Sequence, residues 1–185
     1  MVEPRLTMSS PGSSGGLTIS PLQTGDDACT CARLMAASEP WTTLGRSYQA
    51  SLDIIRDPSR EVYVARDETG LAGFLILCMT GAFVGYIQTV CIAPARRGHG
   101  LGTRLVEFAE QRILQVSPNV FMCVSSFNLS ARRLYERLGY EMIGELTDYI
   151  VQGHSEFLLR KTLGPLTGFA AKAPAEVTHR VGGRG

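Results

Sequence analysis

VCIAPARRGHGLGT, residues 90–103, joins an apolar run rich in β-branched residues to a turn rich in glycine. The run ends at Pro94, and the residues after the turn have the spacing of an amphipathic helix. Three glycines in five residues let backbone N–H groups approach an anion closely, and the first turn of the helix adds unpaired donors and the positive end of its dipole. Arg96 and Arg97 bring positive charge. The stretch therefore predicts a turn that binds phosphate.

Two nucleotide-binding motifs contain turns of this kind, and neither matches. A Walker A loop places Lys and then Ser or Thr after its last glycine, whereas Gly102 is followed by Thr103 and Arg104. In the dinucleotide fingerprint G-x-G-x-x-G, Thr103 occupies the third glycine position, and no acidic residue between 111 and 135 is available to hold a ribose. Nucleotide binding is therefore the weaker alternative, and a purely structural turn is another.

Residues 97–102, RGHGLG, resemble the R/Q-x-x-G-x-G/A acyl-coenzyme A signature of the GNAT superfamily of N-acetyltransferases. A second segment, NLSARRLYERLGY at 128–140, resembles the N-x-x-A-x-x-L-Y-x-x-x-G-F/Y pattern of the same superfamily at every hallmark position. Its apolar residues recur with the period of a helix that starts after Asn128 or Ser130 and stops at Gly139. The two motifs lie one predicted helix and one predicted strand apart, and their combination favours the functional interpretation.

The resemblance implies that acetyl-coenzyme A is the cofactor. The glycine-rich turn would hold its pyrophosphate, and the strand before the turn would give main-chain hydrogen bonds to its pantetheine arm. Asn128 would bond the same arm or an ordered water, and its structural alternative is a helix N-cap. The residues expected to bind the cofactor are Val90, Cys91, Ile92, Arg97, Gly98, His99, Gly100, Leu101, Gly102, Thr103, Asn128 and Tyr135.

Tyr135 is also the predicted general acid. A phenol with a reference pKa of about 10 is protonated at pH 7 and is close to a thiol in acidity, so it can donate a proton to a departing thiolate. The residue lies at the edge of the apolar face of its helix, and a core tyrosine is the structural alternative. The presence of both motifs favours the catalytic role.

The general base is less clearly indicated. Two branches of the superfamily carry a glutamate at positions that Cys123 and Tyr86 occupy in this sequence. Glu39 is the remaining candidate, because it lies in the segment between two helices that lines the acceptor site in the family, together with Trp41, the chain's single tryptophan. A solvated Glu39, a core Trp41 and a water relay are the alternatives. Without a base, an α-amino group is the easier acceptor, since protonation at pH 7 costs it about 1 kcal/mol against about 4 to 5 kcal/mol for lysine.

Hydrophobic periodicity and turn residues predict one mixed α/β domain. The resemblance implies the GNAT acyltransferase fold, a mostly antiparallel sheet that is splayed at the cofactor cleft and flanked by about four helices. The expected strands are 17–22, 62–66, 71–79, 84–93, 120–124, 140–146 and 156–163, and the expected helices are 28–38, 46–56, 100–115 and 128–138. Residues 17–163 form the predicted domain. Both ends are rich in small residues and proline. We expect a flexible N-terminal tail at 1–16 and a disordered C-terminal tail at 164–185.

Composition excludes several classes of function. A net charge of +1, without charged blocks, argues against nucleic-acid and membrane partners. Five cysteines without metal-ligand spacing indicate a reducing compartment, so the protein is expected to be cytoplasmic and to bind no metal. Residues 69–95 carry no charge and are long enough to span a membrane, but their glycines divide them into two strands of a hairpin.

The predicted activity is transfer of an acetyl or short acyl group from acetyl-coenzyme A to a primary amine of a small molecule, a protein N-terminus or a lysine. Direct attack in a ternary complex is expected, with Tyr135 as acid. A non-catalytic module that senses acyl-coenzyme A is the alternative. The sequence leaves open the acceptor and whether the protein is a monomer or a homodimer.

Overall fold

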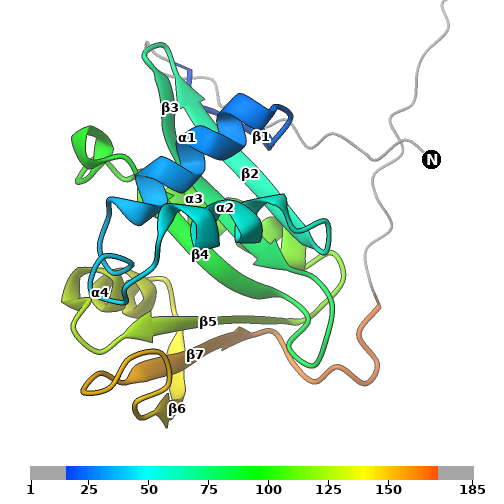
Figure 1. Ribbon diagram of the computed structural model, residues 1–185. Coiled ribbons are helices and arrows are strands. Elements are labelled where there is room, and N and C mark those ends of the chain that lie inside the picture. The colour runs from blue at the N-terminus through cyan, green and yellow to red at the C-terminus, as the bar shows by residue number, and fades with distance from the viewer. Residues whose placement is uncertain (1–15, 171–185) are drawn as a thin grey trace, which may run out of the picture.

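The computed structural model describes residues 16–170 as one seven-stranded sheet with four α-helices (Figure 1). The elements follow the predicted order, which confirms the mixed α/β architecture. They are β1 (Thr18–Pro21), α1 (Gly25–Ala36), α2 (Tyr48–Arg56), β2 (Arg60–Asp67), β3 (Gly70–Cys78), β4 (Tyr86–Ile92), a short 3₁₀ turn (Pro94–Arg96), α3 (Leu101–Ile113), β5 (Asn119–Ser125), α4 (Leu129–Arg137), β6 (Glu141–Leu146) and β7 (Glu156–Thr162).

Two helices begin more than one residue away from their predicted starts, because of their N-caps. Helix α1 begins at Gly25, three residues early, since the hydroxyl of Thr24 accepts a hydrogen bond from the Asp27 N–H at 3.1 Å. Helix α2 begins two residues late, since Ser47 is its N-cap. Leu52 and Ile55 of α2 are buried, whereas Tyr48, the first residue of the helix, is 38% exposed.

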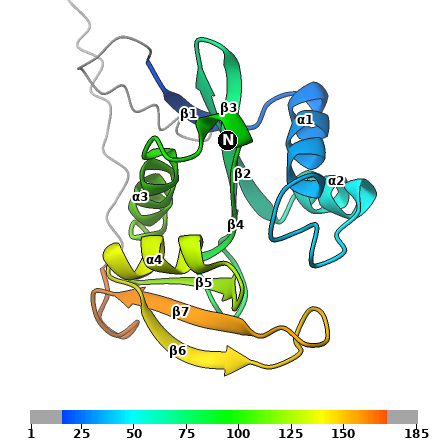
Figure 2. The same ribbon diagram turned by 90° about the vertical axis from the view of Figure 1, so that its left-hand side faces the viewer.

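The helices cover the sheet on both faces (Figure 2). Helices α1 and α2 lie on one side of strands β1–β4 and enclose one apolar cluster, whereas α3 lies on the other side and belongs with α4 to a second cluster. Helix α3 is amphipathic. Its buried face includes Leu101, Leu105, Ala109 and Ile113, and its exposed face carries Arg104, Glu107 and Gln111.

The sheet opens between β4 and β5 (Figure 1). These strands are parallel and pair only at Tyr86 with Phe121 and at Ile87 with Met122, whereas all other strand pairs are antiparallel. Beyond Ile87 the two strands diverge, which confirms the predicted splay. One edge of β4 is therefore left without a neighbouring strand, next to the glycine-rich turn.

Gly85 fixes the entry into β4, and we expect Gly85→Ala to destabilise the fold. Gly85 has φ +89°, and a Cβ atom there would lie 2.4 Å from Ile113 Cγ2 and 2.7 Å from the Asn119 carbonyl oxygen. The left-handed backbone and the collision together are expected to cost about 2 to 4 kcal/mol, measured by urea unfolding. Gly81→Ala is the matched control, because Gly81 also has φ +89° but nothing within 4 Å. An equal loss of unfolding free energy in both variants would show that neighbouring atoms move away from the new Cβ at no energetic cost.

The uncharged stretch 69–95 forms β3 and β4 and the loop between them. Within residues 16–170, no helix has both the length and the apolar character to cross a membrane. Residues 164–170 contain neither helix nor strand. Of the tails predicted at 1–16 and 164–185, residues 1–15 and 171–185 lie outside the described residues.

Candidate functional site

The glycine-rich turn forms a cradle of unpaired backbone donors before α3. Gly98 and Gly100 have φ +79° and +78°, a left-handed conformation that favours glycine, and Gly100 is the N-cap of α3. The Arg104 N–H donates to the Gly100 carbonyl at 3.2 Å. Within the described chain, it is the first backbone N–H after the turn that has a backbone acceptor. The N–H groups from Gly98 to Thr103 are left for a ligand, and together with the helix dipole they suit an anion.

The two arginines of the turn, Arg96 and Arg97, have different partners. Arg96 lies at the turn as predicted, but it forms an ion pair with Asp67 at 2.6 Å, so its charge is already paired. Arg97 has no acidic partner among residues 16–170, and its Nε donates to the Ile92 carbonyl at 3.3 Å. The exposed His99 ring contacts the Arg97 carbonyl through Nδ1 at 2.8 Å. Arg97 is therefore the arginine of the turn whose charge is not paired with an acid among residues 16–170.

A cavity of about 480 Å³ lies over the cradle, between β4 and α4. We call it the cradle cavity. Its walls contain every residue predicted to bind the cofactor except His99, which turns away from it: Val90, Cys91, Ile92, Arg97, Gly98, Gly100, Leu101, Gly102, Thr103, Asn128 and Tyr135. The structure thus brings the two sequence motifs together on one cavity.

The register of β4 separates the three strand residues predicted to offer main-chain bonds. The Ala93 N–H donates to Ala72 on the β3 side at 2.9 Å, so the alternate residue Cys91 also directs its backbone groups to β3. Val90 and Ile92 direct theirs to the open edge. This corrects the prediction for Cys91, which lines the cavity without offering its backbone. Val90 and Ile92 can bond a ligand in the manner of a neighbouring strand.

A second cavity, of about 890 Å³, continues from the first, and we call it the large cavity. Its walls come from the loop between α1 and α2, the hairpin of β3 and β4, the strands β4, β5 and β7, and the segment before β7. The two cavities share a wall made of Trp41, Val90, Asn128, Ala131 and Tyr135. Ligands bound in the two cavities would therefore both contact these shared residues.

Tyr135 lies in the shared wall on α4 and is 9% exposed. Its ring packs edge-on against Tyr140, with 6.1 Å between ring centroids. Burial raises the pKa of Tyr135 to about 12, so the phenol is protonated at neutral pH. No hydrogen bond joins its hydroxyl to another group of residues 16–170, and burial is the one cause of its pKa shift. The residue is placed to give a proton where the two cavities meet.

Asn128 caps α4, as its structural alternative proposed. Its Oδ1 accepts the Ala131 N–H and the Ser130 hydroxyl, each at 3.2 Å. The amide oxygen is therefore occupied by the helix, and the amide NH₂ remains for a ligand in either cavity. Both roles predicted for Asn128 are compatible with this geometry.

Glu39 is exposed, and its carboxylate is engaged in its own turn. It accepts hydrogen bonds from the Thr42 hydroxyl and, at 3.4 Å, from the Thr43 N–H. These bonds hold the pKa of Glu39 below its usual value, which weakens it as a base. Glu39 lines the cradle cavity only, whereas Trp41, 8% exposed, is both a core residue and part of the shared wall. Both interpretations of Trp41 hold, and a base role for Glu39 stays a prediction.

Glu156 is a buried carboxylate of the large cavity that sequence reasoning missed. It is 4% exposed at the start of β7, and its Oε1 accepts the Ser125 hydroxyl of β5 at 2.5 Å. Burial raises the pKa of Glu156, and the bond from Ser125 opposes this in part. Tyr86 and Cys123 line the same cavity, and burial raises the pKa of both. Glu156 thus offers a basic carboxylate that a cavity ligand can reach.

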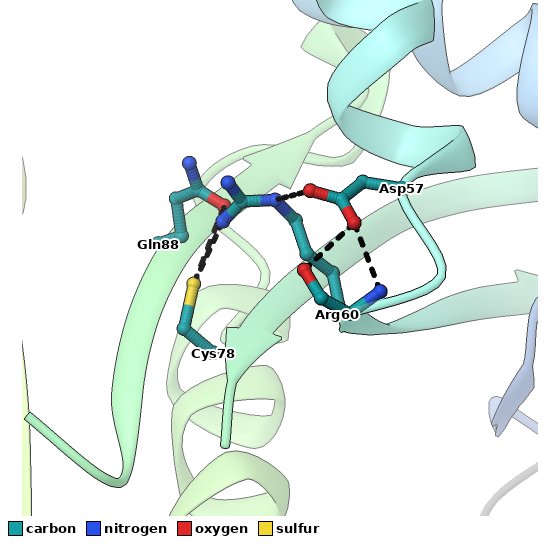
Figure 3. A network of polar contacts seen from close by, with 5 residues as sticks. Asp57, Arg60, Cys78 and Gln88 are labelled. Atoms are coloured by element: carbon teal, nitrogen blue, oxygen red, sulfur yellow. Dashed lines mark hydrogen bonds and ion pairs between the residues drawn. The ribbon is translucent and has the colours of Figure 1, made fainter. Parts of the chain in front are cut away.

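A polar network lies beside the large cavity, where β2, β3 and β4 run side by side (Figure 3). The Arg60 guanidinium donates to Asp57 at 3.2 Å and also to the Cys78 thiol and the Gln88 side-chain oxygen. Gln88 lies at a bulge of β4, because Ile76 pairs with Thr89 and Leu77 pairs with Ile87. Cys78 and Gln88 both line the large cavity.

All five cysteines are free, and Cys78, Cys91 and Cys123 lie in strands, as predicted. No group of three His, Cys, Asp or Glu side chains within residues 16–170 is arranged to hold a metal ion.

Comparison with known proteins relates the chain to acetyltransferases. Residues 27–140 match the model of the acetyltransferase (GNAT) family. N-alpha-acetyltransferase 40 of Saccharomyces cerevisiae is 37% identical over 86 residues, which are 42% of this chain and 30% of that protein. The match thus spans less than a third of the yeast relative.

Two solved structures share the fold. An aminoglycoside 6'-N-acetyltransferase complexed with coenzyme A has a TM-score of 0.64 at 17% identity, and the match covers 80% of this chain and 97% of that one. The NatC complex bound to Gag peptide and coenzyme A has a TM-score of 0.65 at 21% identity, with 80% and 99% covered.

Proposed function

Because the chain belongs to the GNAT acetyltransferase family, we propose that it transfers an acetyl or other short acyl group from acetyl-coenzyme A to a primary amine. The observation that carries this proposal is the wall shared by the two cavities, where Tyr135 lies buried. One cavity has the donors for a phosphorylated cofactor, and the other has a basic carboxylate. Their junction lets donor and acceptor be bound together, which supports direct attack in a ternary complex. Residues 17–163 are the proposed catalytic unit.

The residues of the cradle cavity fit coenzyme A. Unpaired N–H groups from Gly98 to Thr103 and the Arg97 side chain suit a pyrophosphate, and the free edge of β4 at Val90 and Ile92 suits the amides of a pantetheine arm. When bound, acetyl-coenzyme A supplies the acyl group as an activated thioester. This assignment gives the protein a donor site on one side of Tyr135.

Two side chains supply the proton transfers that the reaction needs. An amine that is protonated at pH 7 must lose a proton before it attacks, and the Glu156 carboxylate, whose pKa burial raises, is the proposed acceptor of that proton. Tyr135 holds a proton at its phenol oxygen at neutral pH and gives it to the departing sulfur. Both residues line the large cavity, Tyr135 from α4 and Glu156 from β7.

Release of coenzyme A from acetyl-coenzyme A, measured with and without a panel of primary amines, tests the function. Amine-dependent release with acetylated product in mass spectra supports the enzyme. The rival function, a module that binds acyl-coenzyme A without chemistry, predicts that coenzyme A raises the melting temperature while no amine accelerates release. Stabilisation by ATP or a nicotinamide dinucleotide, but not by coenzyme A, would instead favour the nucleotide-binding alternative.

Arg97→Gln tests the donor site. Loss of one charge-assisted contact to phosphate is expected to raise KM for acetyl-coenzyme A about 5- to 10-fold, with kcat nearly unchanged. The control is Arg104→Gln, because Arg104 is exposed on α3 and does not line the cradle cavity. Steady-state kinetics at low ionic strength measure both variants. An equal KM in Arg97→Gln and Arg104→Gln would place the phosphates elsewhere.

A further inference from the structure

Arg46 brings an unpartnered cationic side chain to the large cavity. It lies in the loop between α1 and α2, where its backbone N–H donates to the Trp41 carbonyl at 2.9 Å. Its Nε is buried without an acceptor, and no carboxylate among residues 16–170 pairs with its guanidinium. Burial lowers the pKa of Arg46, and the charge of Arg60 adds to this. A buried polar group without a partner is unfavourable, so this arginine is arranged for a partner that arrives with a ligand.

Asp57, the acid of the polar network around Arg60, does not pair with Arg46 and is already engaged. Asp57 accepts from Arg60 at 3.2 Å and from the hydroxyl and N–H of Ser59 at 2.7 and 2.9 Å (Figure 3). The Asp57–Arg60 pair has no net charge. The positive charge of Arg46 is therefore the uncompensated one at this end of the cavity.

Gln88 lines the same cavity as Arg46 and accepts a bond from Arg60, whose charge also acts on Arg46, and it adds neutral donors there. An arginine side chain donates hydrogen bonds and accepts none, so the bond from Arg60 fixes the Gln88 oxygen toward Arg60. The Gln88 NH₂ group then points away from Arg60, as Figure 3 shows, and has no acceptor within the described chain. The bulge of β4 places this side chain on the cavity wall. Arg46 and Gln88 together offer several donors and no free acceptor.

We infer that Arg46 and Gln88 form a subsite for a carboxylate of the amine acceptor. The inference rests on the proposed function and names its substrate class: a primary amine that also carries an acid group, either an amino acid or a peptide with an acidic side chain near its N-terminus. A planar carboxylate can accept two parallel hydrogen bonds from the guanidinium group of one arginine. Its single negative charge also balances the single uncompensated positive charge of Arg46. Glu156, on the β5–β7 side of the cavity, would take the amine end.

The test uses pairs of acceptors that differ only in the acid group. One pair is a free amino acid and its amide, and the other is a C-terminally amidated peptide with Glu or Gln at its second position. With rates corrected for the fraction of neutral amine, wild type is expected to show a KM at least about 10-fold lower for one acid member, which is the strength of one charge-assisted contact. The pair that shows the preference distinguishes a free amino acid from a peptide.

Variants assign that preference to the subsite. Arg46→Gln is expected to raise KM for the acid member about 10-fold, to leave the amide member and kcat nearly unchanged, and so to bring the ratio near one. Arg46→Lys is expected to retain part of the ratio. Gln88→Glu keeps an oxygen that accepts from Arg60, but its new negative charge repels the carboxylate of the acceptor. It should therefore remove the acid preference as Arg46→Gln does, and it tests the subsite independently if Arg46→Gln folds poorly. Arg33→Gln is the matched control, because Arg33 is exposed on α1 and lines neither cavity.

The outcomes separate this inference from the proposed function. Acetyl transfer with no acid preference, or a preference that survives in both Arg46→Gln and Gln88→Glu, would overturn the subsite and leave the enzyme intact. If no amine is acetylated, calorimetry with the same pairs on the coenzyme A-loaded protein still decides. Acid-selective binding that Arg46→Gln abolishes supports the subsite, and equal binding of acid and amide overturns it.

Discussion

Glu156→Gln is expected to lower kcat at pH 7 by about 10²- to 10⁴-fold, the usual contribution of a general base. The loss should shrink as the pH rises toward the pKa of the acceptor amine, because an amine that is already neutral needs no base. Glutamine keeps the shape of the side chain, and its oxygen can still accept the Ser125 hydroxyl. Profiles of kcat against pH for both proteins, with one amine, measure the effect.

Stability and a second variant control this result. Because burial raises the pKa of Glu156 in the folded state, the folded protein binds more protons than the unfolded chain above the usual glutamate pKa, and stability falls as the pH rises through that window. Glu156→Gln should therefore be at least as stable as wild type at pH 7, by thermal unfolding. Glu39→Gln is expected to change kcat less than about 2-fold, because the Glu39 carboxylate is held by Thr42 and Thr43, its pKa is lowered and it does not line the large cavity. A large loss in Glu39→Gln, or a loss in Glu156→Gln that is equal at every pH, would contradict the assignment of the base.

Tyr135→Phe is expected to reduce kcat by about 10²- to 10⁴-fold, because it removes the proposed general acid. The ring and its edge-on contact with Tyr140 remain. The lost hydroxyl has no partner within the described chain, so neither stability nor the affinity for coenzyme A should fall. Stopped-flow or steady-state kinetics give kcat, and calorimetry gives the affinity.

Tyr140→Phe is the matched control for this variant. Tyr140 is also buried and packs against Tyr135, but it lines neither cavity. Its loss of a hydroxyl should leave kcat within about 2-fold of wild type, since it touches no reacting group. Full activity in Tyr135→Phe would show that another group, or water, protonates the sulfur. A loss of coenzyme A affinity that matches the loss in rate would indicate a binding role instead.

The order of elements could be predicted from the sequence, because periodicity and turn residues are local signals. Helix α3 shows this: its apolar residues at 101, 105, 109 and 113 recur at helical spacing, and all four are buried. The splay between β4 and β5 followed from the resemblance of two motifs. Helix starts were less accurate, because capping by Thr24 and Ser47 was not recognised.

The chemistry of the large cavity was harder to predict, because it depends on strand register. Glu156 becomes an active-site candidate only when β7 pairs with β5 and sets it opposite Ser125, 31 residues earlier in the chain. A charged residue that opens an apolar strand was the one local signal. Gln88 reaches the cavity through a bulge that alternation cannot reveal. The ion pair of Arg96 with Asp67 also depends on the fold, because it joins residues that are far apart in the chain.

Trp41 gives the protein an intrinsic optical probe. It is the single tryptophan of the chain, and its indole lies in the wall that the cradle cavity and the large cavity share. A ligand that enters either cavity changes the polarity around that indole, and with it the emission spectrum. Fluorescence titration of coenzyme A and of an amine, each with and without the other, therefore reports whether one site must fill before the other, without a label and without turnover.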